Sequence, residues 1–215
     1  MSSNSLAIEA DIKRVQRAVE RHPPRSVSED ESFIRAAVAL VFSPLQDRLV
    51  LTMIRRSKHP QDPWSGHMAF PGGRRDPEDV SELHTAIRET REEVGVVLSE
   101  EDCLGPLSPM RVPYTVSGTT MVIYPYVFLH RQKLHCQPNE EVDGVFHFPL
   151  HSLESGEGRG DFEFPFQGKE MTLDCIELQG CRIWGLSLRM LDELLARISA
   201  NALSEAPASQ GTKER

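Results

Sequence analysis

The spacing of apolar positions predicts a helix near each end of the chain. Ile8, Ile12, Val15 and Val19 recur at helical spacing, and the prolines that follow at positions 23 and 24 end that helix. A second stripe of period 3.6 predicts a C-terminal helix that packs on a sheet, and its members are Leu186, Met190, Leu191, Leu194, Leu195 and Ile198.

Strand-like runs occupy much of the chain between these helices. The segments FIRAAVALVFS and DRLVLTMIRR (33–43 and 47–56) predict a hairpin whose strands are separated by SPLQ. Further strands are expected at Met110–Thr115, at Met121–Leu129, and in VFHFPL, FEFPFQ, MTLDCIEL and CRIWGL, with a Gln179-Gly180 turn between the last two. Strands combined with a mid-chain helix and a terminal helix predict an α/β fold, an α/β/α sandwich with a mixed sheet.

The length of 215 residues favours one domain with extensions. We expect an N-terminal helical extension and linker over residues 1–30, the domain itself over 31–201, and a flexible tail over 202–215. The linker contains SVSEDES, and the tail is rich in small and polar residues.

The mid-chain helix is expected from about Pro77 to Val94, because Asp76-Pro77-Glu78-Asp79 has the composition of a helix start and Gly95 that of a helix end. At about 100° per residue, Glu89, Glu92 and Glu93 fall on one narrow face. Leu83, Ile87, Thr90 and Val94 form a separate stripe that docks on the sheet. The three carboxylates are therefore predicted to point away from the core together.

Clustered carboxylates of this kind suit a hard cation such as Mg²⁺ or Mn²⁺. The alternative interpretation is a solvated helix face on which Arg88 and Glu92 form an ordinary i, i+4 pair. The preceding Pro71-Gly72-Gly73 favours a site, because glycines permit close backbone approach beside the acidic face.

Net charge narrows the choice of partner. With 24 basic and 32 acidic side chains the chain carries a charge of -8, which disfavours broad binding to nucleic acid or to anionic membranes. A bound cation still permits phosphate chemistry on small molecules. Apolar runs are too short for a membrane span, and the start of the chain does not resemble a signal peptide. The four cysteines lack C-x-x-C spacing, and we expect reduced thiols in a cytoplasmic protein.

The mid-chain motif resembles the Nudix hydrolase box. The matching residues are Gly72, Gly73, Arg88-Glu89, Glu92-Glu93 and Gly95-Val96. The first half is one residue longer than the strict pattern, so that Arg74 takes the glycine slot and Val80 the glutamate slot; in the second half Thr90 takes an apolar slot.

A subgroup similar to coenzyme A pyrophosphatases has this longer form. Its elements here are Phe70–Gly73, Asp76-Pro77, Asp79 and Thr85–Glu89, and later landmarks are Glu140–Asp143 and Arg182–Leu186. The resemblance covers roughly residues 33–200. Trp64-Ser65-Gly66-His67 departs from the subgroup's histidine, any residue, glycine, then glutamate or glutamine.

The resemblance implies a fold, an activity and roles for residues. Glu89, Glu92 and Glu93 would hold Mg²⁺ or Mn²⁺, Arg88 would orient the carboxylates, and Gly72 and Gly73 would approach the substrate. The general base would be a box glutamate or an acid outside the box, with Glu140 or Glu141 as the candidates. Asp79 would replace the missing glutamate or, as the preferred interpretation, cap the helix.

Other residues have two interpretations each. Arg56 and Arg74 would bind phosphate or be surface charges. Trp64 and Tyr114 would stack on a base or on pantetheine, or be structural, whereas Trp184 is expected in the core. His67 and His84 lie near the box, but no spacing typical of zinc ligands is present.

The function expected from the resemblance is a metal-dependent pyrophosphohydrolase. It would cleave a diphosphate bond in a nucleoside diphosphate linked to another group, with coenzyme A or its thioesters as the first candidate. Nucleoside diphosphate sugars or dinucleotides are the alternative substrates, and a non-catalytic Nudix-like binding module is the alternative from another class. The partner is a nucleotide-type small molecule, with no nucleic acid and no membrane, and the resemblance is compatible with a homodimer.

Overall fold

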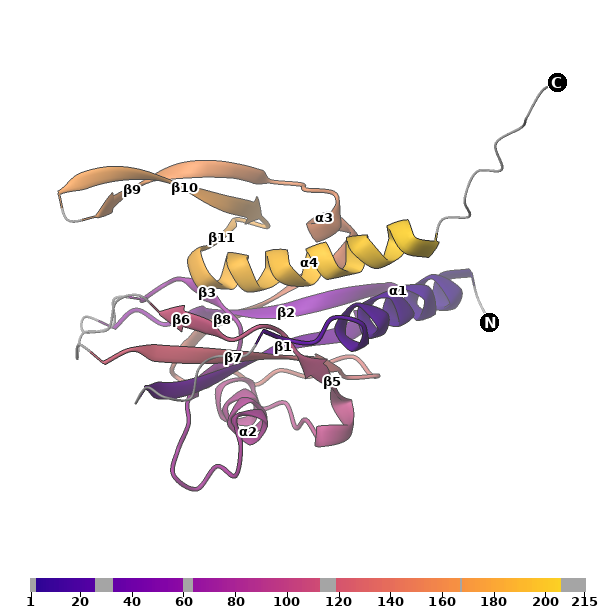
Figure 1. Ribbon diagram of the computed structural model, residues 1–215, viewed down its shortest axis with the longest axis horizontal. Coiled ribbons are helices and arrows are strands. Elements are labelled where there is room, and N and C mark those ends of the chain that lie inside the picture. The colour runs from indigo at the N-terminus through magenta and orange to yellow at the C-terminus, as the bar shows by residue number, and fades with distance from the viewer. Residues whose placement is uncertain (1–2, 26–32, 60–63, 113–118, 167, 206–215) are drawn as a thin grey trace.

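The computed structural model describes residues 3–25, 33–59, 64–112, 119–166 and 168–205 (Figure 1). The first half contains α1 (Ser3–Glu20), β1 (Ile34–Leu45), β2 (Arg48–Arg56), β3 (Met68–Ala69), β4 (Gly72–Arg74), α2 (Glu82–Val94), the 3₁₀ helix η1 (Glu100–Asp102) and β5 (Cys103–Pro106). The second half contains β6 (Met110–Val112), β7 (Met121–Leu129), β8 (Val142–Pro149), α3 (Leu150–Glu154), β9 (Arg159–Phe166), β10 (Lys169–Leu178), β11 (Cys181–Trp184) and α4 (Gly185–Glu205).

The predicted hairpin of β1 and β2 is confirmed, but its turn is shorter than SPLQ. Leu45 pairs with Arg48, so the turn is Gln46-Asp47, whose φ angles are 47° and 63°. Two positive φ values match the twist of a tight hairpin. Pro44 is tolerated in β1 because the parallel pairing of β1 with β7 ends at Phe42, which leaves Pro44 without a partner on that side.

The main sheet is mixed, as predicted. Its strand order is β3-β2-β1-β7-β5, with β4 on β1, β6 on β7 and β8 on β2. β1 and β7 run parallel, while the other pairs are antiparallel. β1 pairs with β2 only from Val41 onward, and its first half pairs with β4, while the second half of β2 pairs with β3. The β3–β4 segment therefore lies in a fork between the two long strands.

Helices cover both faces of this sheet, which confirms the α/β/α sandwich. α2 lies on one face, and α1 and α4 lie together on the other (Figure 1). The larger apolar core lies under α1 and α4, and a second core lies under α2. Because α1 contributes Ile12, Val15, Ala18 and Val19 to the larger core, it packs on the domain as its periodicity predicts. The division expected near residue 30 falls outside the described residues.

A second sheet of three strands, ordered β11-β10-β9, lies on the outer side of α4 (Figure 1). Ile176 and Ile183 are fully buried and tie this sheet to the core. The predicted turn at Gln179-Gly180 is confirmed, with φ angles of 52° and 71°. Trp184 is only half-buried and lies outside the core, so the prediction that it is a core residue is wrong; β11 presents its ring to a groove instead.

The predicted start of the mid-chain helix is also wrong. α2 begins at Glu82 and its N-cap is Ser81, whose side chain accepts a hydrogen bond from the His84 N–H. Asp76 to Asp79 instead form a separate turn, in which the Asp79 N–H donates to the Asp76 carbonyl at 3.0 Å. The helix ends where predicted, because Gly95 has a φ of 70° and its N–H donates to the Arg91 carbonyl.

The structure also describes the cysteine side chains and the apolar character of the helices. All four cysteines have free thiols, and Cys175 and Cys181 do not face each other, since Cys175 pairs with Trp184 and Cys181 with Leu178. In the part of the chain that the structure describes, no helix is long and apolar enough to cross a membrane.

Candidate active site

Glu93 lies on the buried face of α2, contrary to the expectation that all three carboxylates point away from the core. Glu93 is only 3% exposed, and its Oε2 accepts a hydrogen bond from the Gly72 N–H at 2.8 Å. Glu89 is half-buried and Glu92 is exposed. The prediction fails because Gly72 and Gly73 bring backbone close enough to α2 to cover a wider sector of the helix than its apolar residues do.

The two glycines of β4 leave space for different groups, Gly72 for the backbone of β1 and Gly73 for a side chain of α2. Gly72 has a φ of 155°, and a Cβ there would meet the Ala37 carbonyl oxygen and lie 2.6 Å from the Val38 Cα. A Cβ on Gly73 would instead meet Glu89, lying 2.6 Å from its carboxylate carbon. Gly72 is therefore required by the sheet, whereas Gly73 makes room for a carboxylate.

Alanine at these two positions should separate folding from activity. Gly72→Ala is expected to lower the free energy of unfolding by about 3 kcal/mol, because backbone strain and a clash with backbone combine. Gly73→Ala is expected to change stability by about 1 kcal/mol or less, yet to lower hydrolytic activity about tenfold, because it displaces the Glu89 carboxylate.

Urea unfolding and hydrolysis assays measure the two effects. Gly160→Ala is the matched control, since a Cβ there meets nothing within 4 Å. Equal loss of stability in the Gly72 and Gly73 variants would contradict this division of roles.

Arg88 donates hydrogen bonds to three acidic side chains on and beside α2. Its Nε and Nη2 donate to the two carboxylate oxygens of Asp79 at 3.0 and 2.9 Å. Its Nη1 donates to Glu89 at 2.9 Å and to Glu92 at 3.0 Å, and Nη2 also donates to the Arg74 carbonyl. The guanidinium group thus fixes two of the predicted metal ligands relative to each other.

Asp79 binds the Arg88 guanidinium group and is not the cap of α2, whose N-cap is Ser81. The preferred interpretation of Asp79 as a helix cap is therefore wrong. Asp79 is 8% exposed and accepts a hydrogen bond from Thr85 Oγ1 at 2.9 Å as well as the two from Arg88. The hydrogen bonds from Arg88 hold the pKa of Asp79 well below its ordinary value. Asp79 is consequently charged at neutral pH and orients Arg88 from the side away from the glutamates.

Burial raises the pKa of two box glutamates, Glu89 and Glu93, to different extents. The pKa of Glu93 is raised to about 8, mainly by burial and also by the neighbouring Glu89 and Glu141 carboxylates, while the Gly72 N–H and Arg56 act in the lowering direction. Burial also raises the pKa of Glu89, with contributions from Glu92 and Glu141. A site with several desolvated carboxylates favours a positively charged ligand.

Glu141 lies in the loop directly before β8 and reaches the same region as the box glutamates. Its backbone carbonyl accepts from the Ser57 N–H at 2.8 Å, which ties the loop before β8 to the end of β2. Its carboxylate is exposed and lies close enough to Glu89 and Glu93 to raise the pKa of both. The structure thus places Glu141 beside the box; Glu140 is exposed on the same loop.

The predicted metal ligands are oxygen donors of the kind that Mg²⁺ and Mn²⁺ prefer. Among the described residues no three acidic, histidine or cysteine side chains form a ready-made metal site. Arg88 draws Glu89 and Glu92 to itself, while Glu93 accepts from Gly72. The donor set nevertheless fits a hard cation, because the raised pKa values of Glu89 and Glu93 show carboxylates that a cation would stabilise.

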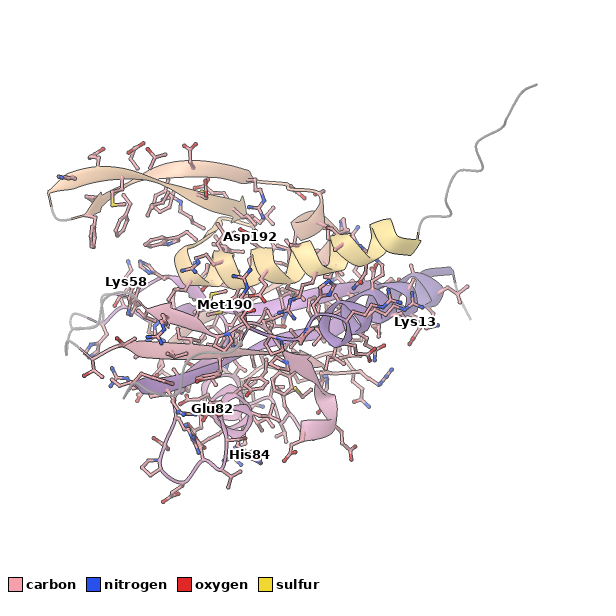
Figure 2. All side chains as sticks on the ribbon, in the orientation of Figure 1. Lys13, Lys58, Glu82, His84, Met190 and Asp192 are labelled. Atoms are coloured by element: carbon pink, nitrogen blue, oxygen red, sulfur yellow. The ribbon has the colours of Figure 1, made fainter. Side chains whose placement is uncertain are left out.

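Other residues singled out in the sequence fall in three places. Arg56 lies near the carboxylates, where its charge lowers the pKa of Glu93, and Arg74 is the exposed last residue of β4. His84 is structural, with Nδ1 2.8 Å from Ser81 Oγ and Nε2 3.1 Å from Glu100. Figure 2 shows Glu82 and His84 on α2, on the opposite side of the sheet from Met190 and Asp192 of α4.

The aromatic candidates lie on the other side of the β3–β4 segment. His67 and Trp184 have ring centroids 4.8 Å apart, and Trp64 stands 6.1 Å from His67. Tyr114 lies outside the described residues. Sequence reasoning missed Phe162 and Phe164, which join this cluster from β9; their alternation along a strand that was predicted is the signal that could have found them.

The residues 33–165 match the profile of the NUDIX domain. The chain belongs to the Nudix family. Relatives include the uncharacterized Nudix hydrolase NudL of Yersinia pestis (strain Pestoides F) and that of Yersinia pseudotuberculosis serotype O:1b (strain IP 31758). Each is 30% identical over 166 residues, covering 77% of this chain and 80% of the relative.

Solved structures share the Nudix fold at low identity. The MutT/nudix family protein from Enterococcus faecalis is 19% identical with a TM-score of 0.53, over 84% of this chain and 66% of that one. The NUDIX domain of Shewanella oneidensis NrtR, complexed with ADP ribose, is 18% identical with a TM-score of 0.53, over 81% and 94%. Family membership makes this Nudix protein an enzyme that hydrolyses pyrophosphate bonds, in preference to the alternative of a non-catalytic module.

Proposed function

We propose that this Nudix enzyme is a metal-dependent pyrophosphohydrolase that cleaves the diphosphate of a nucleoside diphosphate linked to a second group. The observation that carries the proposal is the convergence of Glu89 and Glu93 on the Gly72-Gly73 backbone, with Arg88 holding Glu89 and Glu92. Several partly desolvated carboxylates beside glycine backbone favour a cation and an anionic substrate together.

Glu89, Glu92 and Glu93 would hold Mg²⁺ or Mn²⁺. When bound, the cation would neutralise phosphate charge and lower the pKa of a water molecule. The protein's own groups have separate tasks. Gly72 holds Glu93 through its N–H, and Arg88 keeps Glu89 and Glu92 together. Arg56, whose charge lowers the pKa of Glu93 and which therefore lies near that carboxylate, would pair with a phosphate oxygen.

Glu141 is the proposed general base, and its carboxylate would accept the proton of the attacking water. Its exposure and its position beside Glu89 and Glu93 support the role, because an acceptor that solvent reaches can release the proton after each turnover. A box glutamate remains the alternative base.

Coenzyme A or its thioesters are the first substrate candidates, from the elements shared with the coenzyme A pyrophosphatase-like subgroup. The ADP ribose in the Shewanella oneidensis structure supports the alternative, a nucleoside diphosphate sugar, and dinucleotides belong with it. All these compounds share a nucleoside diphosphate linked to a second group.

Product analysis tests the proposal. The purified protein is incubated with coenzyme A, ADP-ribose, a nucleotide sugar and a diadenosine polyphosphate, each with Mg²⁺, with Mn²⁺ or with chelator. We expect two phosphorylated products from at least one compound, formed only with metal. Release of 3′,5′-ADP and phosphopantetheine would identify coenzyme A as a substrate. Cleavage that persists in chelator would overturn the metal role, and no cleavage of any compound would overturn the proposed substrate class.

A further inference from the structure

A groove of about 410 Å³ lies between the β9–β10 hairpin and the end of the main sheet. Its walls come from β2, from the loop before β3, and from β9 and β11; the residues on which the argument rests are Arg55, His67, Phe162, Phe164, Arg182 and Trp184. Figure 2 shows side chains of the hairpin projecting toward the body of the molecule. The groove is separate from the carboxylates of α2, because none of the box glutamates lines it.

Aromatic rings line this groove in contact with one another. The ring of Trp184 has its centroid 4.8 Å from Phe164, 5.3 Å from Phe162 and 4.8 Å from His67. These rings are half-buried, so part of each remains available to a ligand. Partly exposed aromatic rings that are fixed by mutual contact form a stacking surface for a planar ligand.

The charges of the groove are already balanced. Arg55 pairs with Asp143 at 2.6 Å, and Arg182 pairs with Glu177 at 2.6 Å while lying 4.4 Å over the Phe162 ring. Glu163 also lines the groove. A phosphate would therefore meet no surplus positive charge here, whereas a neutral planar ring would meet aromatic faces and polar edges.

The groove and the carboxylates flank the same short segment of chain. Met68 of β3 lines the groove, and Gly72 of β4 binds Glu93. Gly72 follows Met68 by four positions, a stretch of at most about 14 Å of chain, which is the length scale of a nucleotide with its diphosphate. On β2, Arg55 lines the groove and the next residue, Arg56, acts on Glu93.

We propose that this groove binds the nucleobase of the substrate, with Phe164 and Trp184 as its stacking surface, while the diphosphate lies at the carboxylates of α2. The inference rests on the proposed function for the identity of the substrate. The NUDIX profile match ends at residue 165, so Arg182 and Trp184 lie outside the matched residues.

Tryptophan fluorescence tests the proposal directly, because the two tryptophans of the chain are Trp184 in the groove and Trp64 beside His67. AMP is titrated into the protein in the presence of chelator, with ribose 5-phosphate as the base-free probe. We expect AMP to change the fluorescence saturably and ribose 5-phosphate to leave it unchanged. Phe164→Leu should weaken AMP binding about tenfold.

Met171→Leu is the matched control, since Met171 pairs with Phe164 on the same hairpin but does not line the groove. It should bind AMP as the wild type does. Equal responses to AMP and ribose 5-phosphate, a response to pantetheine but not to AMP, or unchanged binding by a folded Phe164→Leu would each overturn the proposal. Because the wild-type comparison of AMP with ribose 5-phosphate needs no variant, misfolding of Phe164→Leu leaves the test intact.

Kinetics separate this inference from the proposed function. With a nucleotide substrate, Phe164→Leu should raise KM about tenfold and change kcat less than twofold, because stacking is remote from the reacting phosphate. An unchanged KM would count against the groove. Wild-type protein that binds AMP here but hydrolyses none of the nucleotides would refute the proposed function and leave the base site standing.

Discussion

Glu93→Gln is expected to lower metal-dependent hydrolysis about 1,000-fold while leaving the metal-free protein as stable as the wild type or more so. Glutamine has nearly the same size, and its carbonyl oxygen can still accept the Gly72 N–H. With a pKa raised to about 8, mainly by burial, Glu93 is mostly protonated at pH 7 when no cation is present, so a neutral glutamine there matches its charge state. Above about pH 8 the substitution removes a charge that the site disfavours. Hydrolysis assays and thermal unfolding in chelator measure the two effects.

Binding of Mn²⁺ to the same variant, measured by calorimetry, separates ligation from catalysis. The affinity of Glu93→Gln for Mn²⁺ should be at least tenfold lower than that of the wild type. Glu101→Gln is the matched control, because it removes the charge of an exposed glutamate on η1, and it should change neither activity nor Mn²⁺ affinity. Full activity in Glu93→Gln would exclude Glu93 from the metal site.

Arg88→Leu is expected to lower the free energy of unfolding by about 3 kcal/mol, the scale for breaking a buried ion pair from one side. It leaves Asp79, which is 8% exposed, without its guanidinium partner. It also releases Glu89 and Glu92, so activity should fall with stability. Urea unfolding at pH 7 gives the measurement. Arg91→Leu, an exposed position one turn further along α2, should change stability by less than about 0.5 kcal/mol.

The pH dependence of stability gives a second readout. Because Arg88 holds the pKa of Asp79 below its ordinary value of 3.8, the pair contributes stability that is present above about pH 4 and lost as the pH falls below it. Wild-type protein should therefore lose more stability between pH 5 and pH 2 than Arg88→Leu does. Parallel acid profiles would show that Asp79 does not depend on Arg88.

Periodicity predicted the helices and most strands because those elements bury regular apolar stripes. It missed β3, β4 and β5, which have two to four residues and are held by pairing with β1, β2 and β7. The start of α2 was misplaced because Pro77 and the surrounding acids are equally suited to the turn that precedes Ser81.

The candidate site was predictable in its residue types but not in its burial. The wheel placed Glu93 beside Glu89, yet only the tertiary contact with Gly72 decides that Glu93 is buried. Asp79 was expected at the helix cap, and its pairing with Arg88 nine residues later depends on how the turn folds back. The aromatic groove assembles residues more than 100 positions apart, such as His67 and Trp184, which a one-dimensional pattern does not bring together.

The packing of α1 beside α4 determines which parts of the chain must be present together to cover the sheet. The segment that matches the NUDIX profile, 33–165, contains neither of the long helices on that face of the sheet. Taken alone, it would leave Leu40, Leu51 and Leu107 without their cover. The two ends of the chain are therefore one physical layer, and a change in the length or apolar face of either helix constrains what the other can tolerate.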